Sequence, residues 1–214
     1  GFHAGNHADV LKHAVLIFLL DYLLQKPKPL CVIDTHAGAG AYSLESTYAQ
    51  KSGEWRHGIG RLWEAKKLSA PLARYLEIID HFNSAAYPHD RTHGAKQQPG
   101  ETIDHELKCI YPGSPAISAT LLRKEDSLHL FELHPTDLLT LQENFSRQRI
   151  TKPLLSPPRI QIQASNGFAA LKALLPPPSR RGLVLLDPSY EDKQDYAAVV
   201  EAIRAGLTRF ATGT

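Results

Sequence analysis

Methionine is absent from the 214 residues of this chain, and cysteine occurs only twice, at Cys31 and Cys109. Because no methionine precedes it, Gly1 is not a native start, and we expect the chain to be part of a longer protein. The two cysteines form no C-x-x-C pair, which argues against a zinc site and against a disulfide framework. This cysteine usage predicts a reducing, cytoplasmic location, and no metal is expected.

Long apolar runs and a strong excess of one charge are also missing. The most apolar run extends from Ala14 to Leu24, contains Asp21, and is well short of the roughly 20 residues that a membrane span needs. It also lacks the flanks and the cleavage site of a secretory signal. The formal net charge is only +2, so charge alone does not indicate a nucleic-acid partner. The composition, with 43% hydrophobic residues, predicts one globular domain with a sizeable core.

Short apolar runs alternate with helical patterns along the chain. The first helix is expected from His7 to Leu24, with Asn6 as its N-cap. Four strands are expected, in "LCVID", "SLHLFE", "RIQIQ" and "RGLVLLD". Further helices are expected directly after the glycine turn that follows the first strand, and over 136–149, 168–175 and 195–207. This alternation predicts an α/β fold with a doubly wound, mostly parallel sheet and right-handed crossovers.

The first two strands are separated by an unusually long segment. Residues 45–112 have helical patterns and a polar loop from Tyr87 to Glu106, which predicts an inserted helical subdomain. The remaining residues, 1–44 and 113–214, are expected to form one core domain.

Polar residues follow each of the predicted strands. Ligands of parallel sheets bind at the carboxyl ends of the strands, so these positions are candidates for one common site. They are Asp34 with its glycine turn, Glu132, the pair Asn166 and Gly167, and the stretch from Asp187 to Tyr190.

The glycine turn "DTHAGAG" contains Gly38 and Gly40. It does not complete the dinucleotide fingerprint, and no G-K-[S/T] is present, which argues against nicotinamide dinucleotides and ATP. With an acid at the end of a later strand, the turn instead resembles the S-adenosylmethionine site of Rossmann-like methyltransferases. In such a site the glycines let the backbone approach the cofactor, and a carboxylate such as Glu132 accepts hydrogen bonds from both ribose hydroxyls.

The stretch "LVLLDPSY" resembles the D-P-P-Y signature of methyltransferases that act on exocyclic amines of adenine or cytosine. Such an amine is a poor nucleophile because its lone pair is delocalised into the ring. The Asp187 carboxylate and the Pro188 carbonyl can accept its two N–H groups, while Tyr190 stacks on the base. Ser189 replaces the usual second proline, and we expect this change to reduce the activity without abolishing it.

Several longer motifs, taken together, resemble the ribosomal RNA large-subunit methyltransferase J family. They are "FHAGNHADVLKH", "DTHAGAGAY", "YPGSP", "ELHP", "NGF", "RRGLVLLDPSYE" and "RFATGT". The resemblance implies a Rossmann-like methyltransferase that uses S-adenosylmethionine to methylate N6 of one unpaired adenine in 23S ribosomal RNA. It also implies that the later strands of the sheet are missing from this chain, and that residues 1–44 and 113–214 form the cofactor-binding catalytic domain.

The resemblance also implies the roles of single residues. Asp187 would be the catalytic acceptor, supported by Pro188 and Tyr190. The residues expected to contact the cofactor are Lys12, His13, Asp34, His36, Gly38, Gly40, Ser114, Glu132, Asn166 and Gly167. Asn166 departs from the aspartate usual in the family, and because an amide carries no charge its contact is expected to be weaker.

Other interpretations stay open at this stage. The same catalytic loop serves DNA adenine-N6 methyltransferases, and a non-catalytic nucleic-acid-binding protein linked to the use of external DNA is a further alternative. Base access favours unpaired RNA, because unstacking a base costs least in single strands. Phosphate contacts are expected from basic residues in or near the insert and just before the last strand, namely Arg56, Arg61, Lys66, Lys67, Arg91, Lys96, Arg180 and Arg181. No obligatory protein partner is indicated, so a monomer is the working expectation.

Overall fold

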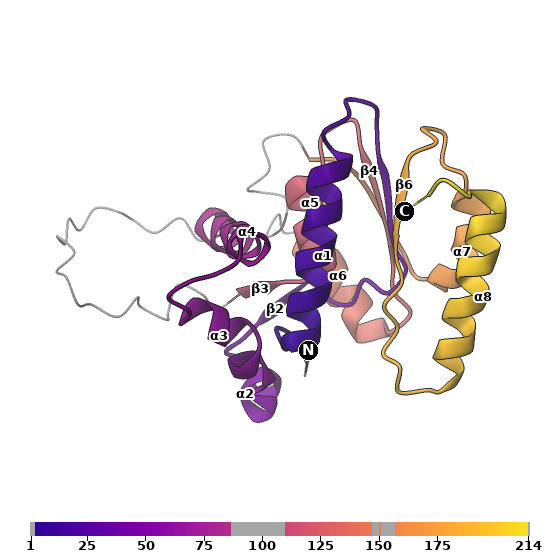
Figure 1. The fold of residues 1–214 in the computed structure, drawn as a ribbon. Helices are drawn as coiled ribbons and strands as arrows, with labels where there is room; N and C mark the ends of the chain where they lie inside the picture. The colour runs from indigo at the N-terminus through magenta and orange to yellow at the C-terminus, as the bar shows by residue number, and fades with distance from the viewer. Residues whose placement is uncertain (1–2, 87–109, 147–149, 151–156, 214) are drawn as a thin grey trace.

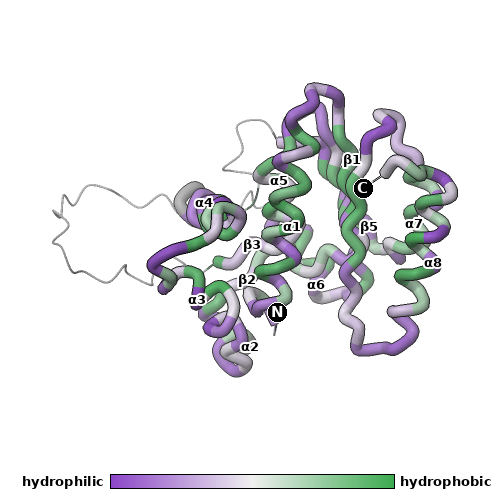
Figure 2. The backbone as a smooth tube through the Cα atoms, in the orientation of Figure 1, coloured by the Kyte–Doolittle hydropathy of each residue, from purple (hydrophilic) through white to green (hydrophobic). Residues whose placement is uncertain are grey.

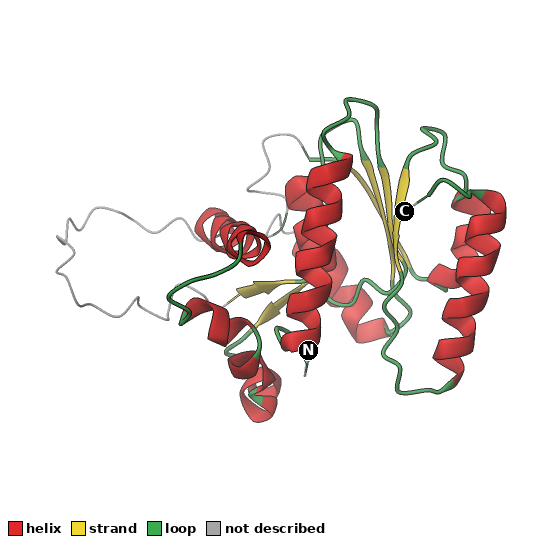
Figure 3. Ribbon diagram, viewed as in Figure 1, coloured by secondary structure: helices red, strands yellow, loops and turns green. Residues whose placement is uncertain are grey.

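The computed structural model describes residues 3–86, 110–146, 150 and 157–213. Its main sheet has four parallel strands in the order β5-β4-β1-β6. The strands are β1 (Cys31–Asp34), β4 (Ser127–Phe131), β5 (Arg159–Gln163) and β6 (Gly182–Leu185). Each lies in one of the predicted strand segments, and the predicted α/β fold with a parallel sheet is confirmed (Figure 3).

Helices cover both faces of this sheet (Figure 1). One face carries α1 (His7–Leu23), α5 (Ser114–Leu121) and α6 (Pro135–Ser146), and the other carries α7 (Gly167–Leu174) and α8 (Gln194–Arg209). Val32 of β1 belongs to the hydrophobic core on the first face, whereas Cys31 and Ile33 belong to the core on the second. Successive side chains of a strand point to opposite faces, so this continuously apolar strand fills both cores. Figure 2 shows the strands as a hydrophobic layer between more polar loops.

The first helix begins as predicted. The Asn6 side chain caps α1 by accepting a hydrogen bond from the backbone N–H of Asp9 at 3.0 Å, and the helix ends at Leu23. In the described part of the chain, no helix is long and apolar enough to cross a membrane.

The glycine turn leads into a strand, so the helix predicted directly after it is wrong. Residues Ala41–Ser43 form β2, which pairs antiparallel with β3 (Ile110–Pro112), so that Tyr42 lies opposite Tyr111. This pairing joins segments about 70 residues apart, and it favours a strand at Tyr42 over the local helical pattern. Helix α5, for which we had no prediction, follows β3 with Gly113 as its N-cap and a proline in its first turn.

Helical elements occupy most of the described residues between β2 and β3, which are 44–86. They are α2 (Thr47–Ser52), the 3₁₀ helix η1 (Glu54–His57), α3 (Ile59–Trp63) and α4 (Ala70–Ala86). Ile59, Tyr75 and Ile79 of this segment belong to the same hydrophobic core as α1. The loop predicted from Tyr87 to Glu106 lies outside the described residues, and the division into a core and an inserted subdomain stays a prediction.

Two helices carry apolar side chains that the described residues leave exposed. They are Leu11, Val15, Phe18 and Tyr22 on α1, and Tyr196, Val200, Ile203 and Leu207 on α8. In each helix these residues follow at helical spacing and form one stripe. Exposed apolar stripes of this kind are typical of surfaces that another element or a partner covers.

A buried carboxylate fixes the beginning of β1. The Asp126 side chain is fully buried and accepts hydrogen bonds from the backbone N–H of Leu30 at 2.8 Å and from the backbone and guanidinium of Arg123 at 2.8 to 3.0 Å. Burial raises the pKa of Asp126, but the hydrogen bonds from Arg123 and Leu30 outweigh this and lower it. One charged group therefore ties the start of β1 to the start of β4.

We expect Asp126→Ala to lower the free energy of unfolding by about 3–5 kcal/mol, because it breaks a buried ion pair and leaves the Leu30 N–H without its acceptor. Urea denaturation at neutral pH measures this change. The neighbouring Glu125→Ala is the control: Glu125 is half-exposed and 3.4 Å from the same guanidinium, so its loss should cost less than about 1 kcal/mol. Equal effects of the two variants would contradict a special role for Asp126.

Candidate active site

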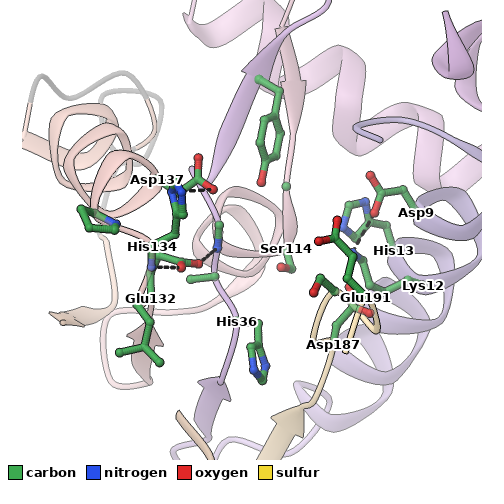
Figure 4. A pocket seen from close by; sticks show the side chains of 17 residues that line it. Asp9, Lys12, His13, His36, Ser114, Glu132, His134, Asp137, Asp187 and Glu191 are labelled. Carbon is green, nitrogen blue, oxygen red and sulfur yellow. Dashed lines mark hydrogen bonds and ion pairs between the residues drawn. The ribbon is translucent and has the colours of Figure 1, made fainter. Parts of the chain in front are cut away.

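A cavity of about 720 Å³ opens at the carboxyl ends of β1, β4 and β6. The strand order reverses at β1, which has β4 on one side and β6 on the other, and such a point is where parallel sheets bind ligands. The predicted residues that line the cavity are Lys12, His13, His36, Gly38, Ser114, Glu132 and Asp187. Figure 4 shows Glu132 on one side of this space and Lys12, His13 and Asp187 on the other.

Glu132, which directly follows β4, holds the glycine turn that follows β1. One carboxylate oxygen accepts the backbone N–H of Gly38 at 2.7 Å, and the other accepts the backbone N–H of His134 at 2.7 Å. Gly38 has φ +58°, and a Cβ there would lie 2.3 Å from the Tyr42 hydroxyl, so both the turn and its contact with Tyr42 require glycine. A carboxylate has about four acceptor positions, so Glu132 retains capacity for two further donors.

Asp34, at the end of β1, is buried beneath the cavity and does not line it. It accepts a hydrogen bond from the Ser114 hydroxyl at 2.7 Å and one from the backbone N–H of His36 at 3.2 Å. Burial raises the pKa of Asp34 to about 6, although both hydrogen bonds favour the ionised form. Asp34 therefore positions two cavity residues, and its predicted contact with a cofactor stays a prediction.

Ser114→Ala should destabilise the protein more at pH 8 than at pH 5. Burial already disfavours the Asp34 carboxylate, so its ionisation costs stability as the pH rises through about 6, and losing the Ser114 hydrogen bond increases that cost. We expect a loss of about 1–3 kcal/mol at pH 8 and a smaller loss at pH 5, where Asp34 is protonated. Urea denaturation at both pH values measures the difference, and a loss independent of pH would contradict it.

Lys12 lies between two carboxylates. Its ammonium is 2.7 Å from Asp9 Oδ1 and 2.6 Å from Asp187 Oδ2. Burial lowers the pKa of Lys12, but Asp9 and Asp187 together raise it above its usual value, so the lysine stays charged. Lys12 thus joins α1 to the loop after β6 and holds the Asp187 carboxylate at the cavity.

Besides Asp34, three predicted cofactor residues lie outside the cavity lining and have structural contacts. Asn166 caps α7 by accepting the backbone N–H of Ala169 at 3.2 Å. A Cβ on Gly167 would lie 2.4 Å from the Thr35 carbonyl oxygen, so α7 approaches the end of β1 closely only with glycine here. Gly40 has φ +77°, which favours glycine. These contacts explain the residues without a ligand, and their predicted cofactor contacts stay predictions.

The loop after β6 places its residues differently. Ser189 lines the cavity, whereas Pro188 is buried and Tyr190 is 36% exposed. Tyr190 has φ +57°, an uncommon conformation for a residue other than glycine, and its ring centroid is 4.8 Å from that of Tyr196. Neither Pro188 nor Tyr190 lines the cavity, so their catalytic roles stay predictions.

Sequence reasoning missed several lining residues, namely Asp9, Tyr42, His134, Asp137 and Glu191. Asp9 lies in the first turn of α1, where the helix dipole alone explains an acid. His134 and Glu191 lie two and four residues beyond strand-end acids that were predicted, so a wider window at each strand end would have found them. No comparable signal pointed to Asp137, which is in the first turn of α6. Its Oδ2 lies 3.7 Å from Nδ1 of His134.

The parallel sheet and the cavity at its switch point define a Rossmann-like α/β protein. Within this class, the chain belongs to the family described as "Ribosomal RNA large subunit methyltransferase D, RlmJ", whose model matches residues 27–93 and 102–214. The predicted family is therefore confirmed.

Curated relatives and a solved structure agree with this assignment. The chain is 44% identical over 212 residues to "Ribosomal RNA large subunit methyltransferase J" of Escherichia coli and 46% identical over 213 residues to the protein of that name from Haemophilus influenzae. A crystal structure of a Legionella pneumophila protein matches with a TM-score of 0.76 and 33% identity, covering 99% of this chain and 67% of that one. This chain spans 65% and 66% of the lengths of the two curated relatives.

Proposed function

We propose that the protein containing this chain transfers a methyl group from S-adenosylmethionine to N6 of an unpaired adenine in 23S ribosomal RNA. The observation that carries this proposal is the cavity between Glu132 and Asp187, with the glycine turn between them. The names of the curated relatives support a ribosomal RNA methyltransferase, and the resemblance of "LVLLDPSY" to D-P-P-Y supports adenine N6.

The residues around the cavity fit S-adenosylmethionine. The cavity volume of about 720 Å³ is within the range of small-molecule sites. Glu132 has acceptor capacity left for two ribose hydroxyls, and the ring nitrogen Nε2 of His13 is buried without a partner. When bound, the cofactor supplies an electrophilic methyl group on a sulfonium.

Asp187 would hold the amino group of the adenine. Its Oδ2 is bonded to Lys12, and among the described residues no hydrogen bond reaches its Oδ1, which is therefore able to accept an N–H of the base. With the Pro188 carbonyl as the second acceptor, the amine lone pair turns out of conjugation with the ring. The ion pair with Lys12 holds the Asp187 carboxylate in place, so that it acts as a fixed acceptor for the amine.

The proposal predicts that Asp187→Asn lowers methyl transfer by about 10²–10³-fold while the cofactor still binds, since one preorganised acceptor is lost. The intact protein is incubated with labelled S-adenosylmethionine and protein-free 23S rRNA, and the RNA is digested to identify N6-methyladenosine. Glu201→Gln, an exposed carboxylate on α8, is the matched control and should retain wild-type activity.

Other results would change the proposal in defined ways. Transfer to DNA but not to RNA would identify a DNA adenine methyltransferase. Nucleic-acid binding with no binding of S-adenosylmethionine would identify a non-catalytic binding protein.

We propose that basic residues of the segment after η1 contact RNA phosphates. Arg61, Lys66 and Lys67 are exposed, and the segment is fixed to the start of α1 by the hydrogen bond from Ile59 N–H to the Gly5 carbonyl at 2.9 Å. It therefore lies beside the helix that lines the cavity (Figure 1). Arg181 is unsuited to this role, because its guanidinium donates to the carbonyls of Leu23 and Lys28.

We expect the double charge reversal Arg61→Glu with Lys66→Glu to weaken RNA binding and to reduce the slope of log affinity against log salt by about 2. Affinity for S-adenosylmethionine should not change. Lys172→Glu, an exposed lysine on α7, is the control and should leave both measurements unchanged. A salt slope unchanged by the double reversal would place the RNA contact elsewhere.

A further inference from the structure

Three buried side chains from distant segments form a hydrogen-bonded chain that ends at the cavity. Nδ1 of His13 on α1 is 2.8 Å from the hydroxyl of Tyr111 on β3, and that hydroxyl is 2.8 Å from the hydroxyl of Tyr75 on α4. The two tyrosines are 0% exposed and His13 is 1% exposed. The other ring nitrogen, Nε2 of His13, has no partner among the described residues, although His13 lines the cavity.

The hydrogens of this chain can be arranged in two ways. If Tyr75 donates to Tyr111 and Tyr111 donates to His13 Nδ1, every hydroxyl hydrogen has an acceptor, and the proton of the imidazole is on Nε2. If instead His13 Nδ1 donates to Tyr111, the hydrogen of either Tyr75 or Tyr111 has no acceptor within this chain of hydrogen bonds, and Nε2 keeps an unpaired lone pair. The first arrangement leaves only the Nε2–H unpaired, and a ligand oxygen that accepts from Nε2 would complete it, so the first arrangement is favoured.

The imidazole itself is neutral, because burial lowers the pKa of His13 to about 3. A neutral imidazole has one donor nitrogen and one acceptor nitrogen, and the hydrogen bond of one nitrogen sets the role of the other. The bond to Tyr111 thus determines what His13 presents to a ligand.

We propose that Tyr111 is a positioning residue that holds His13 as the Nε2–H tautomer, so that Nε2 is a fixed donor for an oxygen acceptor of the bound ligand. The identity of that ligand as S-adenosylmethionine rests on the proposed function. The tautomer itself does not depend on it. In the opposite tautomer, a lone pair of His13 would face the ligand oxygen and repel it.

The tautomer is measured directly by NMR of the intact protein with ¹⁵N-labelled histidine rings at neutral pH, where protonated and unprotonated ring nitrogens have well-separated shifts. His13→Gln identifies the His13 signals among those of the other histidines, ten of which are in this chain. We expect the Nε2–H form in the wild type. An Nδ1–H form would overturn the proposal, whatever the variants show.

Tyr111→Phe removes the partner of Nδ1. We expect both tautomers of His13 in this variant and an affinity for S-adenosylmethionine, measured by calorimetry, that is about three- to tenfold weaker. Unchanged His13 shifts together with wild-type affinity would overturn the proposal.

Tyr75→Phe is the matched control, because it removes a buried hydroxyl from the same cluster but leaves Tyr111 able to donate to Nδ1. It should keep the Nε2–H form, with an affinity within about threefold of the wild type. If Tyr75→Phe mixed the tautomers as strongly as Tyr111→Phe, the effect would be general disruption, and the proposal would fail. If the wild type has the Nε2–H form but binds no S-adenosylmethionine, the proposed function fails while the role of Tyr111 is supported.

Discussion

The position of β1 is the constraint on which the rest of the structure depends. All four of its residues are buried, with Val32 packed on one face of the sheet and Cys31 and Ile33 on the other. A buried carboxylate acts at each end of the strand: Asp126 of the β4 segment holds the backbone before β1, and Asp34 holds the turn after it. The apolar packing fixes the strand laterally, and the two carboxylates fix where it begins and ends.

The register of the sheet determines where the acids of the site lie. Asp34 is paired with Leu130 of β4 and with Leu185 of β6. Glu132 and Asp187 each follow two residues beyond these partners, so the two acids reach out from the same edge on either side of the glycine turn. A slip of one residue in either pairing would point one acid away from the cavity. The acids therefore depend on the strand pairing for their position.

Sequence reasoning identified the features that local physics determines. The apolar runs of the strands, the Asn6 cap of α1 and the acids at the strand ends were all predicted, because each depends on neighbouring residues or on the general rule for parallel sheets. The β2–β3 pairing, the burial of Asp34 and the ion pair between Lys12 and Asp187 were not predicted. The ion pair joins residues 175 positions apart, and only the folded chain shows that these two predicted site residues meet.

The charges around the cavity bear on how one site can serve a cationic cofactor and a polyanionic substrate. The lining contains five carboxylates, from Asp9, Glu132, Asp137, Asp187 and Glu191, and one lysine, Lys12. This balance suits the positive sulfonium of the proposed cofactor, S-adenosylmethionine, and disfavours the phosphates of the proposed RNA substrate, so only the base of the target nucleotide is suited to enter.

Under the proposed function, phosphates would be held outside the cavity, where the exposed basic residues after η1 are available. Lys12 fits this arrangement, because it compensates Asp9 and Asp187 and leaves Oδ1 of Asp187 as an acceptor for the proposed amine. The negative cavity that suits the proposed cofactor would thereby limit which part of the RNA approaches it.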